Sequence, residues 1–203
     1  MGKKIIFDFD GVIADSFDVV YVVANEILRS QGMEEFRSEE ELRDMYKTNF
    51  YESLREKGFS RARIALFVRK LQKILPERYA GVAAFEGIKE VLKRLSENND
   101  LYLVSSNVRK VIEEFNERED LNFLEVLGVE DGKSKVVKIK RVAEDSKEFY
   151  YVGDTLGDMI EGRKAGAKTV GVTWGYHSRD ILEKGKPDFL VDKPEDLLEL
   201  FQN

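Results

Sequence analysis

Apolar strands of the kind found in parallel sheets recur along this chain, but a long helical block separates the first strand from the rest. The apolar run 3–7 predicts a strand covered on both faces. Similar runs at 101–105, 149–152, 169–173 and 189–191 alternate with segments of helical periodicity. This alternation predicts βαβ units, and therefore an α/β fold with a doubly wound parallel sheet.

The block between residues 16 and 81 contains no convincing strand. One helix is expected over 17–31, a second after the capping-box pair Ser38 and Glu41, and a third from Ser60 until Pro76 ends it. A block of this size is too long for a simple crossover. We therefore expect a core domain formed by residues 1–15 and 82–203, and an all-helical cap domain formed by residues 16–81.

Composition excludes several classes of protein. The 203 residues carry 33 Lys and Arg against 39 Asp and Glu, and this acidic balance argues against a nucleic-acid coat protein. The absence of cysteine excludes disulfides, thiolate metal sites and cysteine nucleophiles. No apolar run approaches the ~18 residues of a membrane span, and acidic residues interrupt the N-terminal apolar stretch, unlike in a signal peptide. We expect a cytoplasmic protein, a monomer or homodimer, that binds neither nucleic acid nor a membrane.

The most informative stretch is the acidic pair Asp8 and Asp10, which closes the first predicted strand. Two residues apart on a strand, these side chains point to one face, at the carboxyl end where open α/β sheets bind ligands. Two carboxylates so close repel each other unless a cation lies between them or one keeps its proton. Taken alone, the pair could also be an acidic turn with Gly11 for the bend.

A second acidic pair, Asp154 and Asp158, follows the strand that ends near Gly153. Two strand ends that each offer a carboxylate pair make an oxygen-rich pocket of the kind Mg²⁺ prefers. The alternative is that Asp154 and Asp158 are helix N-terminal acids favoured by the helix dipole.

Two further motifs stand where helices begin. Ser105, Ser106 and Asn107 follow a strand, where hydroxyl and backbone N–H groups form either an anion site or an ordinary N-cap. Lys133 and Lys135 open a later helix, where a lysine opposes the dipole unless it pairs with an anion. A solvated surface lysine is the alternative.

In this order the four motifs resemble the haloacid dehalogenase-like superfamily, whose pattern is DxDx[TV], then Ser or Thr, then Lys, then GDxxxD. Here the pattern falls on residues 8–12, Ser105, Lys133 and residues 153–158. A helical cap between the first two motifs is typical of the phosphoglycolate-phosphatase-like branch, and the resemblance covers the whole chain. Either Lys133 or Lys135 could be the third motif; Lys133 is favoured because it directly follows Gly132, although the proline that often comes next is absent.

The resemblance implies a Rossmann-like core and a mechanism. Asp8 would attack phosphorus to give an aspartyl-phosphate, and Asp10 would act as general acid and then general base. Mg²⁺ would be held by Asp8, the backbone carbonyl of Asp10 and Asp154, with Asp158 as a direct or water-mediated ligand. The phosphoryl oxygens would be held by Ser105, by the amides around Ser106 and Asn107, and by Lys133.

The leading interpretation is a Mg²⁺-dependent phosphatase acting on a small phosphorylated metabolite, either phosphoglycolate-like or a sugar phosphate. A haloacid dehalogenase needs neither a metal nor a second acid, whereas a sugar phosphomutase would need the same residues as the phosphatase. Phosphonate cleavage would add a Schiff-base lysine from the cap, where Lys47, Lys57, Lys70 and Lys73 lie in no recognisable motif. A non-enzymatic phospho-acceptor module of the receiver type would lack the inserted cap.

Aromatic residues and the one histidine carry less specific signals. His177, in a glycine-containing loop, is expected to be solvated or structural rather than catalytic. Tyr176 beside it could border the site or pack within the loop. The cap aromatics are expected to be mainly core, with one or two touching substrate: Tyr21, Tyr46, Phe50, Tyr51 and Phe67.

Overall fold

The computed structural model describes residues 2–132, 134–144 and 146–201. Six parallel strands form one sheet in the order β3-β2-β1-β4-β5-β6, which confirms the predicted doubly wound α/β fold. The strands are β1 (Lys4–Phe7), β2 (Asp100–Val104), β3 (Glu125–Leu127), β4 (Phe149–Gly153), β5 (Lys168–Val172) and β6 (Phe189–Val191). The chain moves outward from β1 to β3 and then returns to the other side of β1, so the topological switch point lies between β1 and β4.

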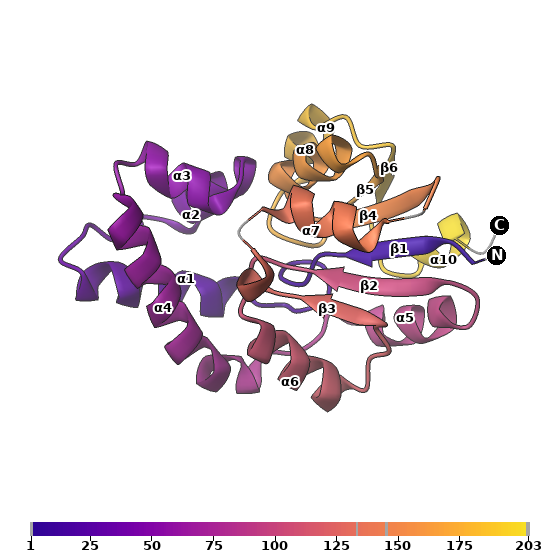
Figure 1. Ribbon diagram of the computed structural model, residues 1–203, viewed down its shortest axis with the longest axis horizontal. Helices are drawn as coiled ribbons and strands as arrows, with labels where there is room; N and C mark the ends of the chain where they lie inside the picture. Colours follow the sequence, from indigo (N-terminus) through magenta and orange to yellow (C-terminus); the bar gives the residue numbers. More distant parts are fainter. Residues whose placement is uncertain (1, 133, 145, 202–203) are drawn as a thin grey trace.

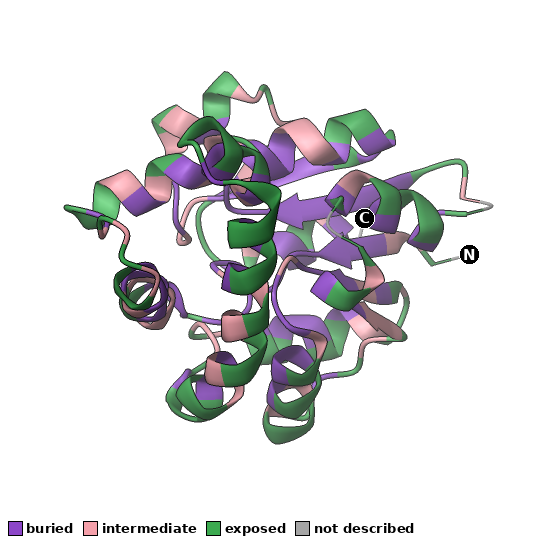
Figure 2. Cartoon of the chain, turned by 60° about the vertical axis from the view of Figure 1, so that its left-hand side comes forward, coloured by how far each residue is buried: buried purple, intermediate pink, exposed green. Residues whose placement is uncertain are grey.

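Helices cover both faces of this sheet, which explains the near-continuous apolar character of its strands. Ile5 and Phe7 of β1 belong to one buried cluster, whereas Ile6 between them belongs to a second cluster on the opposite face. The first face is covered by α5 (Ile88–Ser96), α6 (Arg109–Glu119) and α10 (Asp196–Phe201), and the second by α7 (Lys135–Val142) and α8 (Leu156–Ala165). Figure 2 shows the buried residues along the strands and the inward sides of the helices. Helix α9 (Arg179–Lys184) and the 3₁₀ turn η3 (Val129–Asp131) complete this part.

Between β1 and α5 the chain forms a separate group of helices, here called the helical insert (residues 16–81), beside the carboxyl ends of the strands (Figure 1). It contains α1 (Phe17–Ser30), α2 (Glu39–Asp44), η1 (Met45–Lys47), α3 (Phe50–Glu56), α4 (Arg61–Arg78) and η2 (Tyr79–Gly81). The Ser38 hydroxyl accepts the backbone N–H of Glu41 at 3.2 Å, as the capping pattern predicts.

One local prediction was wrong and one strand was missed. Pro76 does not end its helix, because α4 continues to Arg78; a proline this close to the end removes only one hydrogen bond before the helix stops. Strand β3 was not predicted, because its three residues are too few to show a periodic pattern. Within the described residues, no helix is both long and apolar enough to cross a bilayer.

Candidate active site

Three neighbouring strands end at the same edge of the sheet and each delivers a polar side chain there. Asp8 follows β1, Ser105 follows β2 and Asp154 follows β4. The Asp8 backbone N–H donates to the carbonyl of Val152 at 2.9 Å, which continues the pairing of β1 with β4 one residue beyond the strand. The parallel register therefore places residues that are far apart in sequence around one point, the switch point of the sheet.

Gly11 lets the chain turn tightly over this point. Its φ of 77° lies in the left-handed region, and a Cβ at this position would overlap the Asp154 carboxylate. The glycine of the first motif is therefore required both by backbone conformation and by the close approach of the second acidic motif.

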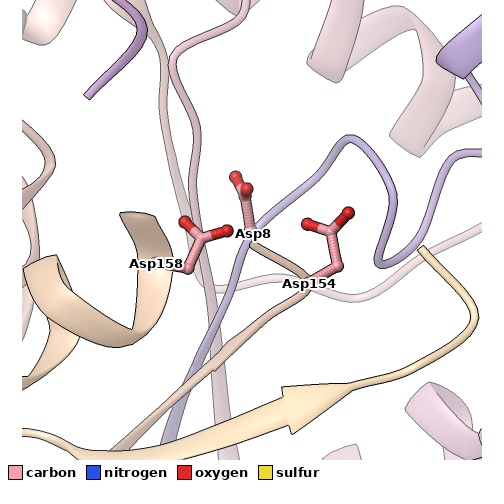
Figure 3. Close-up of side chains that lie close together, drawn as sticks. All are labelled: Asp8, Asp154 and Asp158. Carbon is pink, nitrogen blue, oxygen red and sulfur yellow. The ribbon is translucent and has the colours of Figure 1, made fainter. Parts of the chain in front are cut away.

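The carboxylates of Asp8, Asp154 and Asp158 point into one space (Figure 3), and one oxygen of each lies within 4.8 Å of the others. Lys135 bridges two of them, since its ammonium donates to Asp8 at 2.7 Å and to Asp158 at 2.6 Å. Lys133, the lysine favoured by the sequence, lies outside the described residues. The alternative lysine, Lys135, lies in the site, between Asp8 and Asp158.

Burial and mutual repulsion perturb the pKa values of the three carboxyl groups. Burial, partly offset by Lys135, raises the pKa of Asp8 to about 7. Burial and the neighbouring carboxylates of Asp158 and Asp8 raise the pKa of Asp154 well above its usual value. Burial opposes ionisation of Asp158 as well, but Lys135 and the hydrogen bonds from Lys135, Thr155 and Tyr151 hold the pKa of Asp158 below its usual value.

This trio fits a divalent cation. Oδ1 of Asp8 and Oδ1 of Asp154 are buried and accept no hydrogen bond from any residue that the structure describes. An unpartnered buried carboxylate oxygen is costly, and carboxylates as close as those of the trio repel each other. A hard cation with oxygen ligands would relieve both costs, so the chemistry of the donor set matches the ion class that the sequence predicts.

Asp10 lies beside the trio in a separate hydrogen-bond network. Its Oδ1 accepts the hydroxyl of Ser16 at 2.7 Å and that of Tyr79 at 2.6 Å, and its Oδ2 accepts the Asn107 amide at 2.9 Å. Burial raises the pKa of Asp10. The hydrogen bonds from Tyr79, Ser16 and Asn107 lower this pKa, but by less than burial raises it. Ser16 and Tyr79 stand at the two ends of the helical insert, so both of its connections to the sheet contact this carboxylate.

The second motif borders the same pocket. The Ser105 hydroxyl accepts the backbone N–H of Asn107 at 2.9 Å, and the Ser106 carbonyl accepts the Tyr51 hydroxyl at 3.3 Å. Asn107 therefore uses its backbone N–H and its amide within the protein, toward Ser105 and Asp10. All three residues line the pocket with Asp8, Asp10, Asp154, Asp158 and Lys135.

The loop after β5 joins the site to the helical insert. The Tyr176 backbone N–H donates to Oδ2 of Asp154 at 2.7 Å, and the Tyr176 hydroxyl lies 3.0 Å from that of Ser16. His177 is buried; its Nδ1 accepts the Leu156 N–H and its Nε2 donates to the Arg43 carbonyl, both at 2.9 Å. The structural role expected for His177 is confirmed, and Tyr176 borders the site.

Residues 5–172 match the family described as haloacid dehalogenase-like hydrolase. The chain belongs to this family. Among its haloacid dehalogenase-like relatives, a phosphoglycolate phosphatase of Synechococcus elongatus is 30% identical over 97% of this chain and 96% of that protein. A phosphoglycolate phosphatase of Vibrio parahaemolyticus is 26% identical over 98% of this chain and 95% of that protein.

Solved structures of haloacid dehalogenase-like proteins share the fold. A hydrolase from Pseudomonas syringae superposes with a TM-score of 0.81 over 98% of both chains, at 19% sequence identity. An identity this low supports the fold alone.

Three residues of the site carried no signal in the sequence. Ser16 and Tyr79 lie in no recognised motif, and their contact with Asp10 depends on how the insert returns to the sheet. Lys138 is buried beneath the site, where it donates to the carbonyls of Ser105 and Gly128, and burial followed by the charge of Lys135 lowers the pKa of Lys138 to about 8. A lysine in the middle of an amphipathic helix gives no hint of such burial.

Proposed function

We propose that this hydrolase is a Mg²⁺-dependent phosphatase that cleaves a small phosphomonoester through an aspartyl-phosphate on Asp8. The observation that carries this proposal is the Asp8 carboxylate. Its buried Oδ1 has no partner among the described residues, its Oδ2 accepts a hydrogen bond from Lys135, and the Asp154 carboxylate lies close by. The names of the relatives that match nearly the whole chain, both phosphoglycolate phosphatases, support the same reaction class.

Nucleophilic attack by Asp8 on an anionic phosphate must overcome charge repulsion. At 4 Å and an effective dielectric of about 20, this repulsion is about 4 kcal/mol for each pair of unit charges. Lys135 offsets part of it from its position against Asp8. Mg²⁺ would be held by Asp8, Asp154 and the Asp10 backbone carbonyl, and by Asp158 either directly or through water. When bound, the ion would act as a Lewis acid that stabilises the charge on the phosphoryl oxygens.

Asp10 is the proposed general acid and base. As Asp8 forms its bond to phosphorus, the bond from phosphorus to the leaving oxygen breaks, and Asp10 gives that oxygen its proton. Water then attacks the phosphorus of the acyl phosphate, Asp10 takes a proton from it, and inorganic phosphate leaves Asp8 free. The raised pKa of Asp10, caused by burial, favours the protonated form that the first step requires.

The remaining residues would bind and enclose the phosphoryl group. Ser105 and the backbone around Ser106 and Asn107 are the proposed phosphate contacts, with Lys135 in the place that the sequence gives to Lys133. The helical insert would act as a cap that excludes water during the reaction.

The test is a panel of phosphomonoesters, including phosphoglycolate, sugar phosphates and p-nitrophenyl phosphate, assayed with Mg²⁺ and with EDTA. We expect phosphate release that needs Mg²⁺ and is lost in Asp8→Asn, whose amide cannot form the acyl phosphate. Halide release from a haloacid in chelator would instead identify a dehalogenase. Transfer of the phosphoryl group to another sugar hydroxyl rather than to water would identify a mutase.

A further inference from the structure

An apolar channel leads from the acidic site into the helical insert. The pocket that holds Asp8 and Asp10 continues between α1, α3 and α4. Most of the lining on the insert side is apolar: Val20, Ala24, Phe50, Phe67, Val68, Leu71 and Leu75. The polar lining residues of the insert carry no charge: Tyr46, Thr48, Asn49, Tyr51 and Tyr79. This space lies where the leaving group of a phosphomonoester would extend once its phosphate meets Asp8.

We infer that this enzyme prefers phosphomonoesters whose leaving group is uncharged and apolar, either aryl or medium-length alkyl, over substrates that carry a carboxylate. This inference rests on the proposed phosphatase function and narrows its substrate class. It departs from phosphoglycolate, the substrate named for the two relatives above.

The charge of the pocket lining disfavours a substrate that carries a carboxylate. Among the described lining residues, Lys135 is the one cationic side chain, and its ammonium already contacts Asp8 and Asp158. The lining also includes Glu161, a further acidic group. Among the described lining residues, a second carboxylate on the substrate would find no free cation to pair with, and burial without one is strongly unfavourable.

The basic residues of the insert do not line this channel. Arg43 donates to the Tyr176 carbonyl at 2.8 Å, and its guanidinium lies 3.5 Å from the centre of the Phe17 ring. Arg55 and Arg61 line a neighbouring hollow together with Glu52 and Glu161. The candidate Schiff-base lysines lie outside the lining as well: Lys47, Lys57, Lys70 and Lys73.

Packed aromatic rings of the insert line the channel. The Phe50 ring stacks on Tyr46 at 5.2 Å between centroids and lies 6.0 Å from Phe67, so the three aromatic rings form one continuous wall of the channel. Tyr46 in turn meets the ring of Tyr176 edge-on at 5.3 Å, beside the acidic site. An apolar or aromatic leaving group would cover this wall and remove its surface from water.

The test is a homologous series of ethyl, butyl and hexyl phosphate beside phosphoglycolate, with phenyl phosphate as the aryl member. The alkyl leaving groups have nearly equal intrinsic reactivity, so kcat/KM reports contacts in the channel. We expect kcat/KM to rise by about threefold or fourfold for each methylene that is buried, in line with ~0.8 kcal/mol per methylene. Phosphoglycolate should be at least tenfold poorer than butyl phosphate.

Leu71→Lys places a cation on the channel wall, and Leu66→Lys is the matched control, because Leu66 lies on the same helix but is exposed and outside the lining. Leu71→Lys should flatten the alkyl series and narrow the gap to phosphoglycolate, whereas Leu66→Lys should leave both unchanged.

A flat alkyl series in the wild-type enzyme, or preference for phosphoglycolate over butyl phosphate, overturns the inference while leaving the phosphatase function intact. These wild-type measurements stand even if Leu71→Lys fails to fold. Failure to hydrolyse any phosphomonoester, p-nitrophenyl phosphate included, overturns the proposed function itself and the inference with it.

Discussion

The Tyr79 hydroxyl, at the end of the helical insert, lies 2.6 Å from Oδ1 of Asp10, the second carboxylate of the first motif. The Ser16 hydroxyl, at the start of the insert, donates to the same oxygen at 2.7 Å. Both connections of the insert therefore meet on one carboxylate. Any movement of the insert relative to the sheet would change the hydrogen bonding of the proposed acid.

Tyr79→Phe tests this link. Loss of the donor removes a bond that favours the ionised form, so the pKa of Asp10 should rise and the basic limb of the pH–rate profile should move to higher pH. We expect kcat to fall about tenfold, as for a hydrogen bond to a charged group of about 1.5 kcal/mol. Tyr21→Phe is the control, since the Tyr21 hydroxyl donates to the Phe36 carbonyl within the insert. An unshifted profile for Tyr79→Phe would contradict the link.

Asp10→Asn separates acid–base chemistry from metal positioning. An alkyl alcohol must be protonated as it leaves, whereas p-nitrophenolate leaves without help, so the loss should be about 10²–10⁴-fold on an alkyl phosphate and far smaller in the first burst of p-nitrophenol. Slow hydrolysis of the phospho-enzyme should follow, because Asp10 also activates water. The measurement is pre-steady-state p-nitrophenol release beside kcat/KM on the alkyl ester. Equal losses, with no burst, would leave Asp10 only a role in positioning the metal.

Asp154→Asn tests the cation site through stability. Because burial and neighbouring carboxylates penalise the charged Asp154, the amide should raise the Tm of the metal-free protein and abolish the increase caused by Mg²⁺. In the wild type, Mg²⁺ at 100 times its Kd should add about 2.7 kcal/mol, or about 5–10 °C in Tm. Asp180→Asn, at an exposed aspartate in the first turn of α9, should keep the full Mg²⁺ effect. A normal Mg²⁺ shift in Asp154→Asn would place the cation elsewhere.

Lys135→Met tests whether Lys135 or Lys133 is the lysine that contributes to catalysis. Removal of the ammonium between Asp8 and Asp158 should lower kcat by about 10²–10³-fold, the usual effect of losing one group that stabilises developing charge. The matched substitution is Lys133→Met, at the lysine that the sequence favours. Thermal unfolding of both variants separates catalysis from folding. A larger loss at Lys133 would show that the sequence prediction was the correct one.

His177 predicts a specific pH dependence of stability. Burial lowers the pKa of His177 below the ~6.5 of an unfolded histidine, so below that pH the unfolded chain binds more protons. The contribution of neutral His177 is therefore complete above pH ~6.5 and is lost as the pH falls toward its folded pKa. Protonation would also break the bond that Nδ1 accepts from Leu156.

His177→Gln is the comparison, because every other titrating group is common to both proteins. The variant should unfold at a lower temperature at pH 7.5 but lose less on acidification to pH 5.5. Each kcal/mol of this difference corresponds to about 2–4 °C in Tm. Parallel Tm curves for the two proteins would rule out the assignment.

The sequence alone predicts the sheet and most of the acidic site, for a physical reason. A strand buried on both faces is apolar at almost every position, so β1 and β4 are visible locally. In a parallel sheet the residues that follow such strands meet at one edge, so Asp8 and Asp154 can be placed together before any coordinate is known. Ser38 is equally local, since its hydroxyl caps the helix that begins beside it.

Only the tertiary structure decides what depends on distant contacts. Lys135 reaches Asp8 across 127 positions of sequence and Tyr79 reaches Asp10 across 69. The sequence left Lys135 as one of two candidate lysines, and nothing near Tyr79 indicates its partner. The apolar channel is likewise formed by faces of α1, α3 and α4 that each read as ordinary core when taken alone. Local sequence specifies which side a helix buries, whereas the packing of helices against one another determines whether that side meets a neighbour or surrounds a space for substrate.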